Sequence, residues 1–308
     1  MLADYALKTY RASMVCANPD YRASHRWYQE NKRLLLQHGP IDLVIQAEGD
    51  AKECALAFQQ AITFFDIVLV SLVDELALLR TRVSDLNGVE FKSVVAHRML
   101  KAVAPYSEYF VTPMAAVAGS VADCTLAAMC VNRSLSRVAV NNGGDIALHL
   151  QGNSSYTIGI CDNPVSGSQQ ANAQIHAANP VRGIATSGWH GRSHSLGIAD
   201  AVTVLAASAS QADVAATMIA NHIDLPGSNK VERAPASSLS PDSDLGLHEV
   251  TVDVQTLTPA ECQTALAAGE RFAQSLVSKG LMNSAVLTLQ DERLVVGHYP
   301  SINWKHSA

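Results

Sequence analysis

The sequence predicts a mixed α/β (α+β) protein that folds as one compact unit, and three observations support this prediction. Hydrophobic residues make up 48% of the 308 residues and charged residues only 16%, which is enough for a large core. Short apolar runs of strand length alternate with longer runs whose apolar residues recur at helical spacing. No Gly/Pro/Ser-rich linker divides the chain, so residues 1–308 are treated as a single unit.

Strands are predicted where apolar residues alternate with polar ones or form short buried runs. These segments are 41–46, 137–141, 146–150, 156–161, 182–186, 201–206, 249–254, 284–290 and 293–297. Helices are predicted where an apolar stripe or a run of small residues persists over several turns. They cover about 51–83, 113–133, 210–222 and 258–280.

The boundaries of two helices are marked by their residue types. Pro113 is suited to the first helical turn, where its missing N–H costs nothing. Thr258 is a predicted N-cap that forms a capping box with Glu261. Three other segments are expected to lack regular structure: an N-terminal arm over 1–40, a polar stretch over 162–180 and a surface excursion over 226–246.

Charge and cysteine content exclude several classes of protein. The chain has 22 basic and 28 acidic residues, a net charge of −6, and no Lys/Arg run of the kind that binds nucleic acid. No stretch reaches the roughly 18 uncharged residues of a membrane span, and the N-terminus lacks the apolar core of a signal peptide. The six cysteines show no CxxC spacing and are expected to be reduced. A cytoplasmic protein that binds a small molecule is therefore expected.

Asp213 and Thr217 are four residues apart, so on a helix they project from the same face. A carboxylate beside a hydroxyl offers hard oxygen ligands of the kind that Mg²⁺ prefers. In the alternative interpretation, Asp213 caps a helix and Thr217 bonds back to a carbonyl. The pair Ala122-Asp123 is repeated as Ala212-Asp213 in a second small-residue segment, a weak similarity that an internal duplication would explain.

Two further segments could bind a ligand. The turn Asn141-Asn142-Gly143-Gly144-Asp145 offers backbone N–H groups beside a carboxylate, although a simple β-turn would have the same residues. Thr186-Ser187-Gly188 places two hydroxyls beside a glycine and could bind an anion. Ser187 or Thr186 could also be a nucleophile with His190 or His194 as its base. The two histidines could instead bind zinc, although no third ligand is visible.

Arg192 follows in the same loop and could clamp a carboxylate or phosphate, or could simply be solvated.

The chain resembles the ApbE-like proteins, the FAD:protein FMN transferases. The resemblance rests on four segments in the same order: the N-G-G-D turn, the T-S-G segment, the V-T-V strand, and Ala212-Asp213 followed by Thr217. The similarity is greatest to an uncharacterised branch of that superfamily and extends over most of the chain. It implies two interleaved α/β lobes around a central cleft. It also implies that Asp213, Thr217 and the backbone carbonyl near Ala118 bind Mg²⁺.

The same resemblance implies FAD or FMN as a ligand, with Asn141–Gly144, Thr186–Gly188 and Arg192 around it. The chain differs from the transferases in having Ala118 in place of a lysine, and it lacks their H-I-x-D-P-x-T-G segment. Three functions follow as hypotheses. The first is a magnesium-assisted enzyme, such as a transferase, acting on a flavin or another phosphorylated or carboxylated molecule. The others are a non-catalytic metabolite-binding module and a hydrolase.

Candidate catalytic residues under these hypotheses are Asp145, Ser187 and His194. The oligomeric state is open, although the small-residue helix favours close subunit packing and makes a homodimer one expected state.

Overall fold

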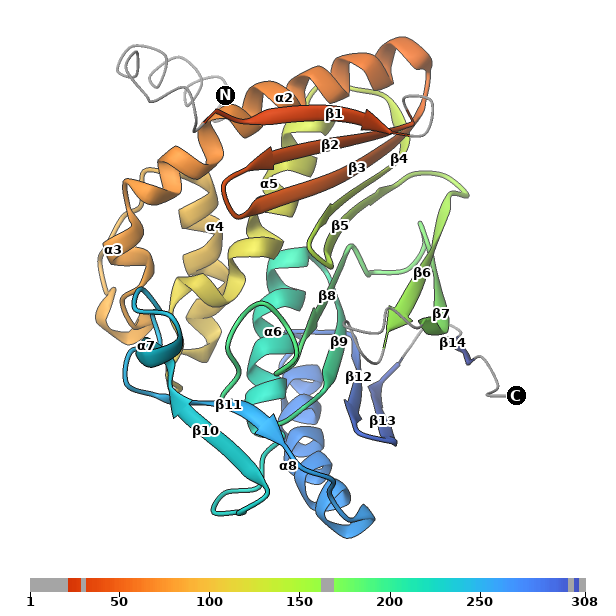
Figure 1. Ribbon diagram of the computed structural model, residues 1–308. Coiled ribbons are helices and arrows are strands. Elements are labelled where there is room, and N and C mark those ends of the chain that lie inside the picture. The colour runs from red at the N-terminus through yellow and green to blue at the C-terminus, as the bar shows by residue number, and fades with distance from the viewer. Residues whose placement is uncertain (1–21, 29–31, 162–168, 299–301, 305–308) are drawn as a thin grey trace.

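A nine-stranded antiparallel sheet runs through the whole protein (Figure 1). The computed structural model describes residues 22–28, 32–161, 169–298 and 302–304. The sheet has the order β1-β2-β3-β4-β5-β8-β9-β12-β13. Its strands are β1 (Ser24–Tyr28), β2 (Arg33–His38), β3 (Ile41–Gly49), β4 (Leu135–Asn142), β5 (Asp145–Leu150), β8 (Gly183–Ser187), β9 (Ala201–Ala206), β12 (Ser284–Leu289) and β13 (Glu292–Gly297).

Two smaller sheets complete the β-structure. One contains β14 (Ile302–Trp304), β7 (Gln169–His176) and β6 (Ser155–Cys161), and the other pairs β10 (Val231–Pro235) with β11 (Glu249–Val254). The helices are α2 (Ala51–Val73), α3 (Leu76–Leu79), α4 (Val94–Val103), α5 (Val117–Cys130), α6 (Ala209–His222), α7 (Ala236–Leu239) and α8 (Pro259–Ser278). Short 3-10 turns occur at η2 (Val83–Asp85), η3 (Ala104–Tyr106) and η4 (Pro113–Ala116).

The two faces of the large sheet bury different neighbours because side chains alternate along a strand. On β4, Val138 and Val140 join the core formed with α2 and α5, whereas Ala139 packs on the opposite side. On that opposite face Leu148 and Leu150 of β5 meet the small sheet of β6 and β7. The long helices therefore cover one face, and the small sheet covers the centre of the other.

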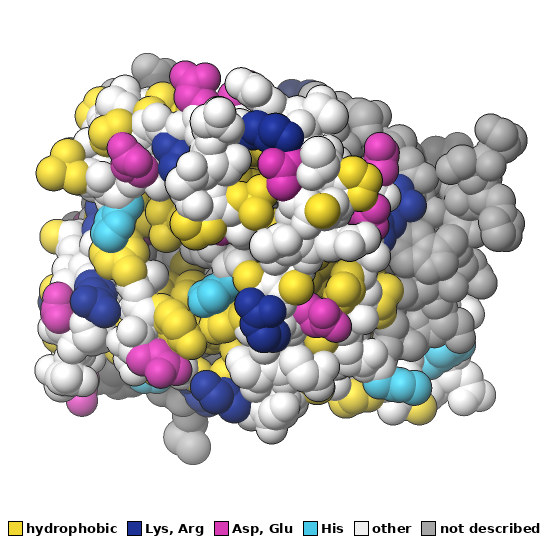
Figure 2. All heavy atoms as spheres, turned by 90° about the horizontal axis from the view of Figure 1, so that it is seen from below, with side chains coloured by type: hydrophobic (Ala, Val, Ile, Leu, Met, Phe, Trp, Pro, Cys, Tyr) yellow, Lys and Arg dark blue, Asp and Glu magenta, His cyan; other side chains and the backbone are white. Residues whose placement is uncertain are grey.

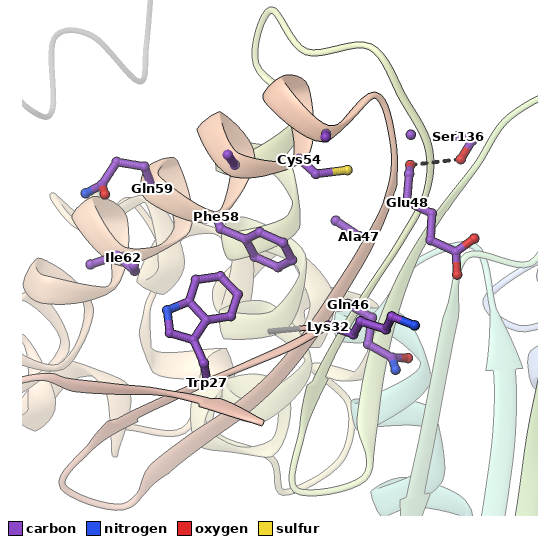
Figure 3. Close-up of a pocket in the computed structure, with 13 residues that line it drawn as sticks. Trp27, Lys32, Gln46, Ala47, Glu48, Cys54, Phe58, Gln59, Ile62 and Ser136 are labelled. Atoms are coloured by element: carbon purple, nitrogen blue, oxygen red, sulfur yellow. Dashed lines mark hydrogen bonds between the residues drawn. The ribbon is translucent and has the colours of Figure 1, made fainter. Parts of the chain in front are cut away.

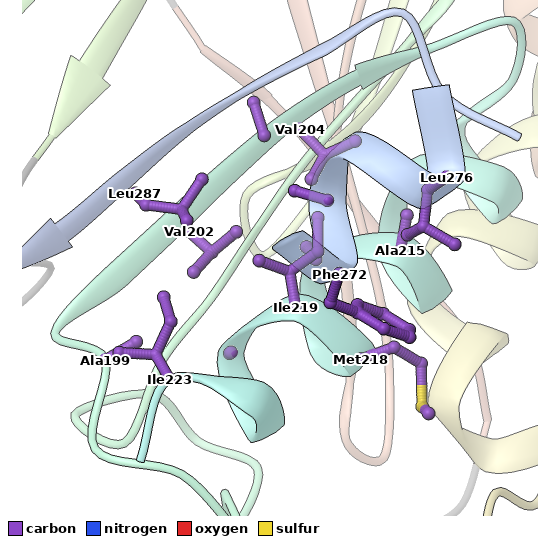
Figure 4. Packing of buried hydrophobic residues seen from close by; sticks show 14 of the residues in the cluster. Ala199, Val202, Val204, Ala215, Met218, Ile219, Ile223, Phe272, Leu276 and Leu287 are labelled. Atoms are coloured by element: carbon purple, nitrogen blue, oxygen red, sulfur yellow. The ribbon is translucent and has the colours of Figure 1, made fainter. Parts of the chain in front are cut away.

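The large sheet consists of two halves with the same order of elements. In the first half the hairpin β2–β3 is followed by helices and then by the hairpin β4–β5. In the second, β8–β9 is followed by helices and then by β12–β13. Each half has its own apolar core. Figure 4 shows the second, where Ile219 of α6, Ile223 just after α6 and Phe272 of α8 pack under Val202 and Leu287 of the sheet.

The mixed α/β fold predicted from the sequence is confirmed, but four segment predictions need correction. The arm over 1–40 is not irregular throughout, because β1 and β2 occupy its second part; residues 1–21 lie outside the described chain. The helix over 51–83 ends at Val73, since Glu75 leaves helical geometry and accepts the N–H groups of Lys92 (2.7 Å) and Ser93 (2.8 Å).

The remaining two corrections concern segments that were predicted as irregular. Within 162–180, β7 forms a strand because Ile175 and Ala173 are buried against the large sheet; residues 162–168 lie outside the described chain. Within 226–246, β10 and α7 are regular, since β10 pairs with β11 and Ala236 is fully buried. Polar composition hid both elements, because it reports solvent contact rather than hydrogen bonding.

Two helical segments, 51–73 and 113–130, are long and apolar enough to span a membrane by length and composition alone. Both contribute to the core beside the sheet, through residues such as Phe65 and Val121. One face of the molecule, seen from below in Figure 2, carries basic and acidic side chains interspersed around apolar ones in a shallow hollow. Neither sign of charge dominates this face.

Candidate active site

The hairpin between β4 and β5 positions the first group of candidate residues. Asn142 and Asp145 are cross-strand partners, so Gly143 and Gly144 alone form the turn. Their φ angles of 64° and 117° lie in the region that side chains disfavour, which explains the paired glycines. A Cβ on Gly143 would also lie 2.3 Å from the Arg192 guanidinium. The turn is thus built to let Arg192 approach the backbone.

Asp145, the first residue of β5, connects this hairpin to the T-S-G segment. Its carboxylate accepts the backbone N–H of Thr186 on β8. Burial raises the pKa of Asp145 well above its usual value, and the neighbouring carboxylate of Asp213 raises it further. Arg192 acts in the opposite direction and lowers it. Asp145 is therefore influenced by one carboxylate and one cation nearby.

Asp213 projects from α6 towards the start of α5. It accepts the N–H of Gly119 at 2.9 Å and also a hydrogen bond from the N–H of Ala118. Burial nevertheless raises the pKa of Asp213 to about 7. The carbonyl of Ala118 in turn accepts the side-chain amide of Asn142 at 3.1 Å. Ala118 thus lies between the carboxylate of α6 and the hairpin turn.

The close contact between α5 and α6 depends on Gly119. A Cβ at this position would lie 2.3 Å from the carbonyl oxygen of Ala209, at the start of α6. Thr217 follows Asp213 by about one helical turn on α6 and is only partly buried. The structure therefore brings the N-G-G-D turn, Thr186, the Ala118 backbone and Asp213 together, with Thr217 on the adjoining turn.

The T-S-G segment contributes mainly its backbone. The Thr186 hydroxyl is hydrogen-bonded to the Thr203 hydroxyl on the next strand at 2.9 Å, so it is already satisfied. Ser187 is the last residue of β8 and pairs with Val202. Gly188 follows, where a Cβ would lie 2.2 Å from the Asp200 carbonyl oxygen. The glycine permits the chain to turn closely over the start of β9.

The two histidines of the following loop have partners other than the T-S-G hydroxyls. The Nε2 atom of His190 lies 3.2 Å from Asp200, which also accepts the Trp189 indole N–H at 3.0 Å. The Nε2 atom of His194 lies 3.1 Å from the Ser240 hydroxyl. Neither histidine is hydrogen-bonded to Thr186 or Ser187 in the described part of the chain. Within that same part, no cluster of three His, Cys, Asp or Glu residues could hold a metal such as zinc.

Three residues that were not among the predicted site residues also shape the site. Asp42 on β3 lies 3.8 Å from Arg192. Asp200 holds the loop that carries Trp189 and His190. Asp123 accepts the N–H groups of Ala209 and Ser210 and therefore fixes the start of the helix that carries Asp213. Only Asp123 had a visible signal, its place in the repeated Ala-Asp pair.

The fold and this group of oxygens define a mixed α/β protein with two neighbouring carboxylates, Asp145 and Asp213, where the β4–β5 hairpin meets α5 and α6. Residues 25–297 match the model of the family described as AbpE bacteria, and the chain belongs to that family. The ApbE-like assignment made from the sequence is thereby confirmed at the level of the family.

The chain is also similar to proteins named as UPF0280 proteins. It is 35% identical over 184 residues to a UPF0280 protein of Methanopyrus kandleri, a match that covers 58% of this chain and 69% of that protein. It is 40% identical over 112 residues to a UPF0280 protein of Methanococcus vannielii, covering 36% of this chain and 45% of the other. The chain therefore spans less than half of that second relative.

Among solved structures, the apo flavinyl transferase ApbE of Pseudomonas stutzeri matches with a TM-score of 0.42 and 11% identity, covering 91% of this chain and 95% of the other. A point mutant of the flavin transferase ApbE of Vibrio cholerae matches with a TM-score of 0.36 and 12% identity. It covers 91% of this chain and 97% of that one.

Proposed function

We propose that this protein is a magnesium-dependent enzyme acting on a phosphorylated or carboxylated small molecule, with a flavin nucleotide as the most specific candidate substrate. The observation that carries the proposal is the neighbouring pair of Asp145 and Asp213. Both carboxylates are partly buried with raised pKa values, and Asp213 contributes to the rise at Asp145. A cation placed between them would stabilise both ionised forms.

The residues present fit a magnesium ion. Mg²⁺ binds one or two carboxylates together with neutral oxygens and water. Asp213 and Asp145 supply the carboxylates, while the Thr217 side-chain hydroxyl on α6 and the Ala118 backbone carbonyl on α5 are candidate neutral oxygens. Asp213 accepts the N–H groups of Gly119 and Ala118, and each carboxylate oxygen has further lone pairs for a cation. Bound magnesium would neutralise negative charge that develops on a substrate phosphate or carboxylate.

Arg192 and the glycine turn are suited to orienting the anionic substrate. The Arg192 side chain is 69% exposed and its only ion pair in the described residues is the long one with Asp42. It can therefore move onto a ligand at small cost and donate two parallel hydrogen bonds. Gly143 and Gly144 keep the backbone clear of side chains beside it. Asp145 is held beside this turn by the hydrogen bond that it accepts from the Thr186 N–H.

The metal part of the proposal is tested by titrating Mg²⁺ into the purified protein by calorimetry and by thermal shift. We expect saturable binding that Asp213→Asn and Asp145→Asn each weaken by at least about tenfold, since each removes a charged ligand. Asp42→Asn is the matched control, because Asp42 is also acidic and lies near Arg192 but not at the carboxylate pair. Equal Mg²⁺ affinity in all four proteins would refute the site.

The substrate part needs a separate experiment. The protein is incubated with FAD and Mg²⁺, and AMP release and covalent flavin are followed by chromatography and mass spectrometry. Turnover that depends on Asp213 would support the flavin version of the proposal. If the protein binds Mg²⁺ but leaves FAD intact, the flavin version fails and the metal site stands. Stabilisation by FAD without turnover would favour the alternative of a non-catalytic flavin-binding module.

The hydrolase hypothesis with Ser187 or Thr186 as nucleophile has less support from the geometry. A general base must reach the hydroxyl within roughly 3.2 Å, directly or through water. His194 is instead hydrogen-bonded to Ser240 and His190 is paired with Asp200. The Thr186 hydroxyl is bonded to Thr203. We therefore rank this function below the magnesium-dependent enzyme.

A further inference from the structure

A cavity lies in the first half of the sheet where β3 ends and β4 begins, and the hairpin turn of the candidate site lies at the other end of β4. The cavity has a volume of about 1130 Å³ and is bounded by the start of α2, by β1 and by the end of β3. That volume is just above the usual range for small-molecule sites. None of the site residues described above lines it. We name it the α2 groove, after the helix that forms one of its walls (Figure 3).

One end of the α2 groove is aromatic and apolar. Trp27 of β1 meets Phe58 of α2 edge to face, with ring centroids 5.0 Å apart and planes at 84°. Ile62 extends the same wall one helical turn along α2. Trp27 is 38% exposed, so part of this large apolar ring is in contact with solvent and is available to a ligand. Both rings line the cavity (Figure 3), and because Phe58 is buried, the exposed Trp27 indole is the surface on which a planar ring can stack.

The other end of the groove is polar and carries one uncompensated charge. Lys32, Gln46 and Glu48 lie there, opposite the aromatic wall (Figure 3). Glu48 is already paired with Arg137 at 2.6 Å. No ion pair among the described residues involves Lys32. The charge available to a ligand at this end is therefore positive.

We propose that the α2 groove is a binding site for a small aromatic anion, whose ring stacks on the exposed Trp27 indole and whose anionic group is held by Lys32. The separation of an apolar wall from a single cation selects for a planar ring that carries a carboxylate or sulfonate at one end. This site does not depend on the magnesium site or on its substrate, since the two share no residue.

The proposal is tested with a pair of probes that differ in charge. 1-Anilinonaphthalene-8-sulfonate carries a fused aromatic ring and a sulfonate, while N-phenyl-1-naphthylamine has the same rings without the anion. We expect the sulfonate to bind with quenching of tryptophan emission that Trp27→Phe reduces. Lys32→Gln should lower the affinity for the sulfonate by about threefold, as expected when a partly exposed charge pair is lost. It should leave the affinity for the neutral probe unchanged. Lys52→Gln, at an exposed lysine of α2 that does not line the groove, should change neither.

A blocking variant makes the test independent of charge. Ala55 lines the groove and is exposed, so Ala55→Trp fills the cavity without disturbing the core. Leu56→Trp is its control, because Leu56 is the next residue, is 41% exposed and does not line the groove. We expect Ala55→Trp to abolish sulfonate binding and Leu56→Trp to retain it, with unchanged circular dichroism in both. Asp213→Asn should also retain it, which separates this site from the magnesium site.

Cys54 provides a readout that does not use fluorescence. This thiol lines the groove and is partly exposed, whereas Cys130 is outside it. Saturating sulfonate should slow alkylation of Cys54 by iodoacetamide, measured by peptide mass spectrometry, and leave Cys130 unaffected. The proposal is overturned if Lys32→Gln and Ala55→Trp bind the sulfonate as the wild type does, or if Cys54 is not protected at saturation.

Discussion

Asp123 and Asp213 cap each other's helices. Asp123, on α5, accepts the N–H groups of Ala209 and Ser210 at the start of α6, each at 3.0 Å. Asp213, on α6, accepts the N–H of Gly119 at the start of α5, at 2.9 Å. Each carboxylate therefore satisfies orphan donors of the helix that carries the other and faces the positive end of its dipole. The repeated Ala-Asp pair in the sequence has this structural meaning.

The two carboxylates differ in their charge environment. Asp123 is also paired with Arg98 at 3.3 Å and bonded to the Ser210 hydroxyl at 2.8 Å. No ion pair among the described residues involves Asp213, and both Asp145 and Asp123 lie near it as like charges. We infer that Asp123 holds the two helices together, whereas Asp213 retains an electrostatic strain that a bound cation would relieve.

Replacing Asp123 should therefore destabilise the fold. Asp123→Ala leaves two buried N–H groups and Arg98 without their acceptor, and we expect a loss of about 2–3 kcal/mol in the free energy of unfolding. Urea denaturation measures it. Ser208→Ala is the comparison, because Ser208 is the local N-cap of α6 and its loss should cost about 1 kcal/mol. An Asp123 variant no less stable than the Ser208 variant would contradict the structural role.

Replacing Asp213 should not destabilise the fold, and should even stabilise it, when no divalent cation is present. Its pKa is raised to about 7, so at pH 8 the folded protein bears an ionised carboxylate that its surroundings disfavour. Asp213→Asn removes that charge and keeps an oxygen for the Gly119 N–H. We expect a melting temperature at pH 8 with chelator equal to or above that of the wild type. A fall of several degrees would show that the carboxylate is a structural cap only.

The contact between α5 and α6 offers a steric test. A Cβ on Gly119 would meet a backbone carbonyl of Ala209 at 2.3 Å, whereas a Cβ on Gly269 would meet the Ile223 side chain at 2.3 Å. Backbone cannot move away without separating the helices, but a side chain can rotate. Gly119→Ala should thus cost about 3 kcal/mol or more, and Gly269→Ala about 1–3 kcal/mol, by chemical denaturation. Equal losses would argue against a rigid α5–α6 contact.

Sequence reasoning located the hairpin and helices well where the pattern was local. The paired glycines at 143–144 predicted a tight turn, and Thr258 with Glu261 predicted the capping box that the structure shows. It could not find the partners of Asp145 or Asp213, because Thr186 and Gly119 are brought to them only by the sheet order and by helix packing. The α2 groove was also invisible, since β1 lies in a segment whose polar residues do not alternate with apolar ones.

The partners of the two histidines also could not be predicted from the sequence. Spacing alone made His190 and His194 a pair, either for zinc or as alternative bases for Ser187. In the fold they have different partners: His190 lies beside Asp200, which packs against the Gly188 turn, and His194 lies beside Ser240 of the 226–246 segment. The spacing of two residues in a loop does not show which way their side chains point, and that orientation decides which partners the two histidines have.

His222 provides a pH-dependent prediction far from the candidate site. It lies near the C-terminal end of α6, stacked on Phe272 of α8 with ring centroids 3.7 Å apart and planes at 7°. Burial lowers the pKa of His222 below its usual 6.5, although the Met218 carbonyl at 2.7 Å acts in the opposite direction. The folded protein thus binds this proton less readily than the unfolded chain. The stability contributed by neutral His222 should be complete above about pH 6.5 and should be lost as the pH falls through the lower, folded value.

The measurement is urea denaturation between pH 7.5 and about 5, comparing the slope of stability against pH. His222→Gln should flatten that slope below pH 6.5, because the titrating group is gone, even if it lowers stability at every pH through lost stacking. His97→Gln, an exposed histidine on α4, should keep the wild-type slope. A slope in the His222 variant equal to that of the wild type would assign the acid sensitivity to other groups and leave the His222–Phe272 stack as a packing contact alone.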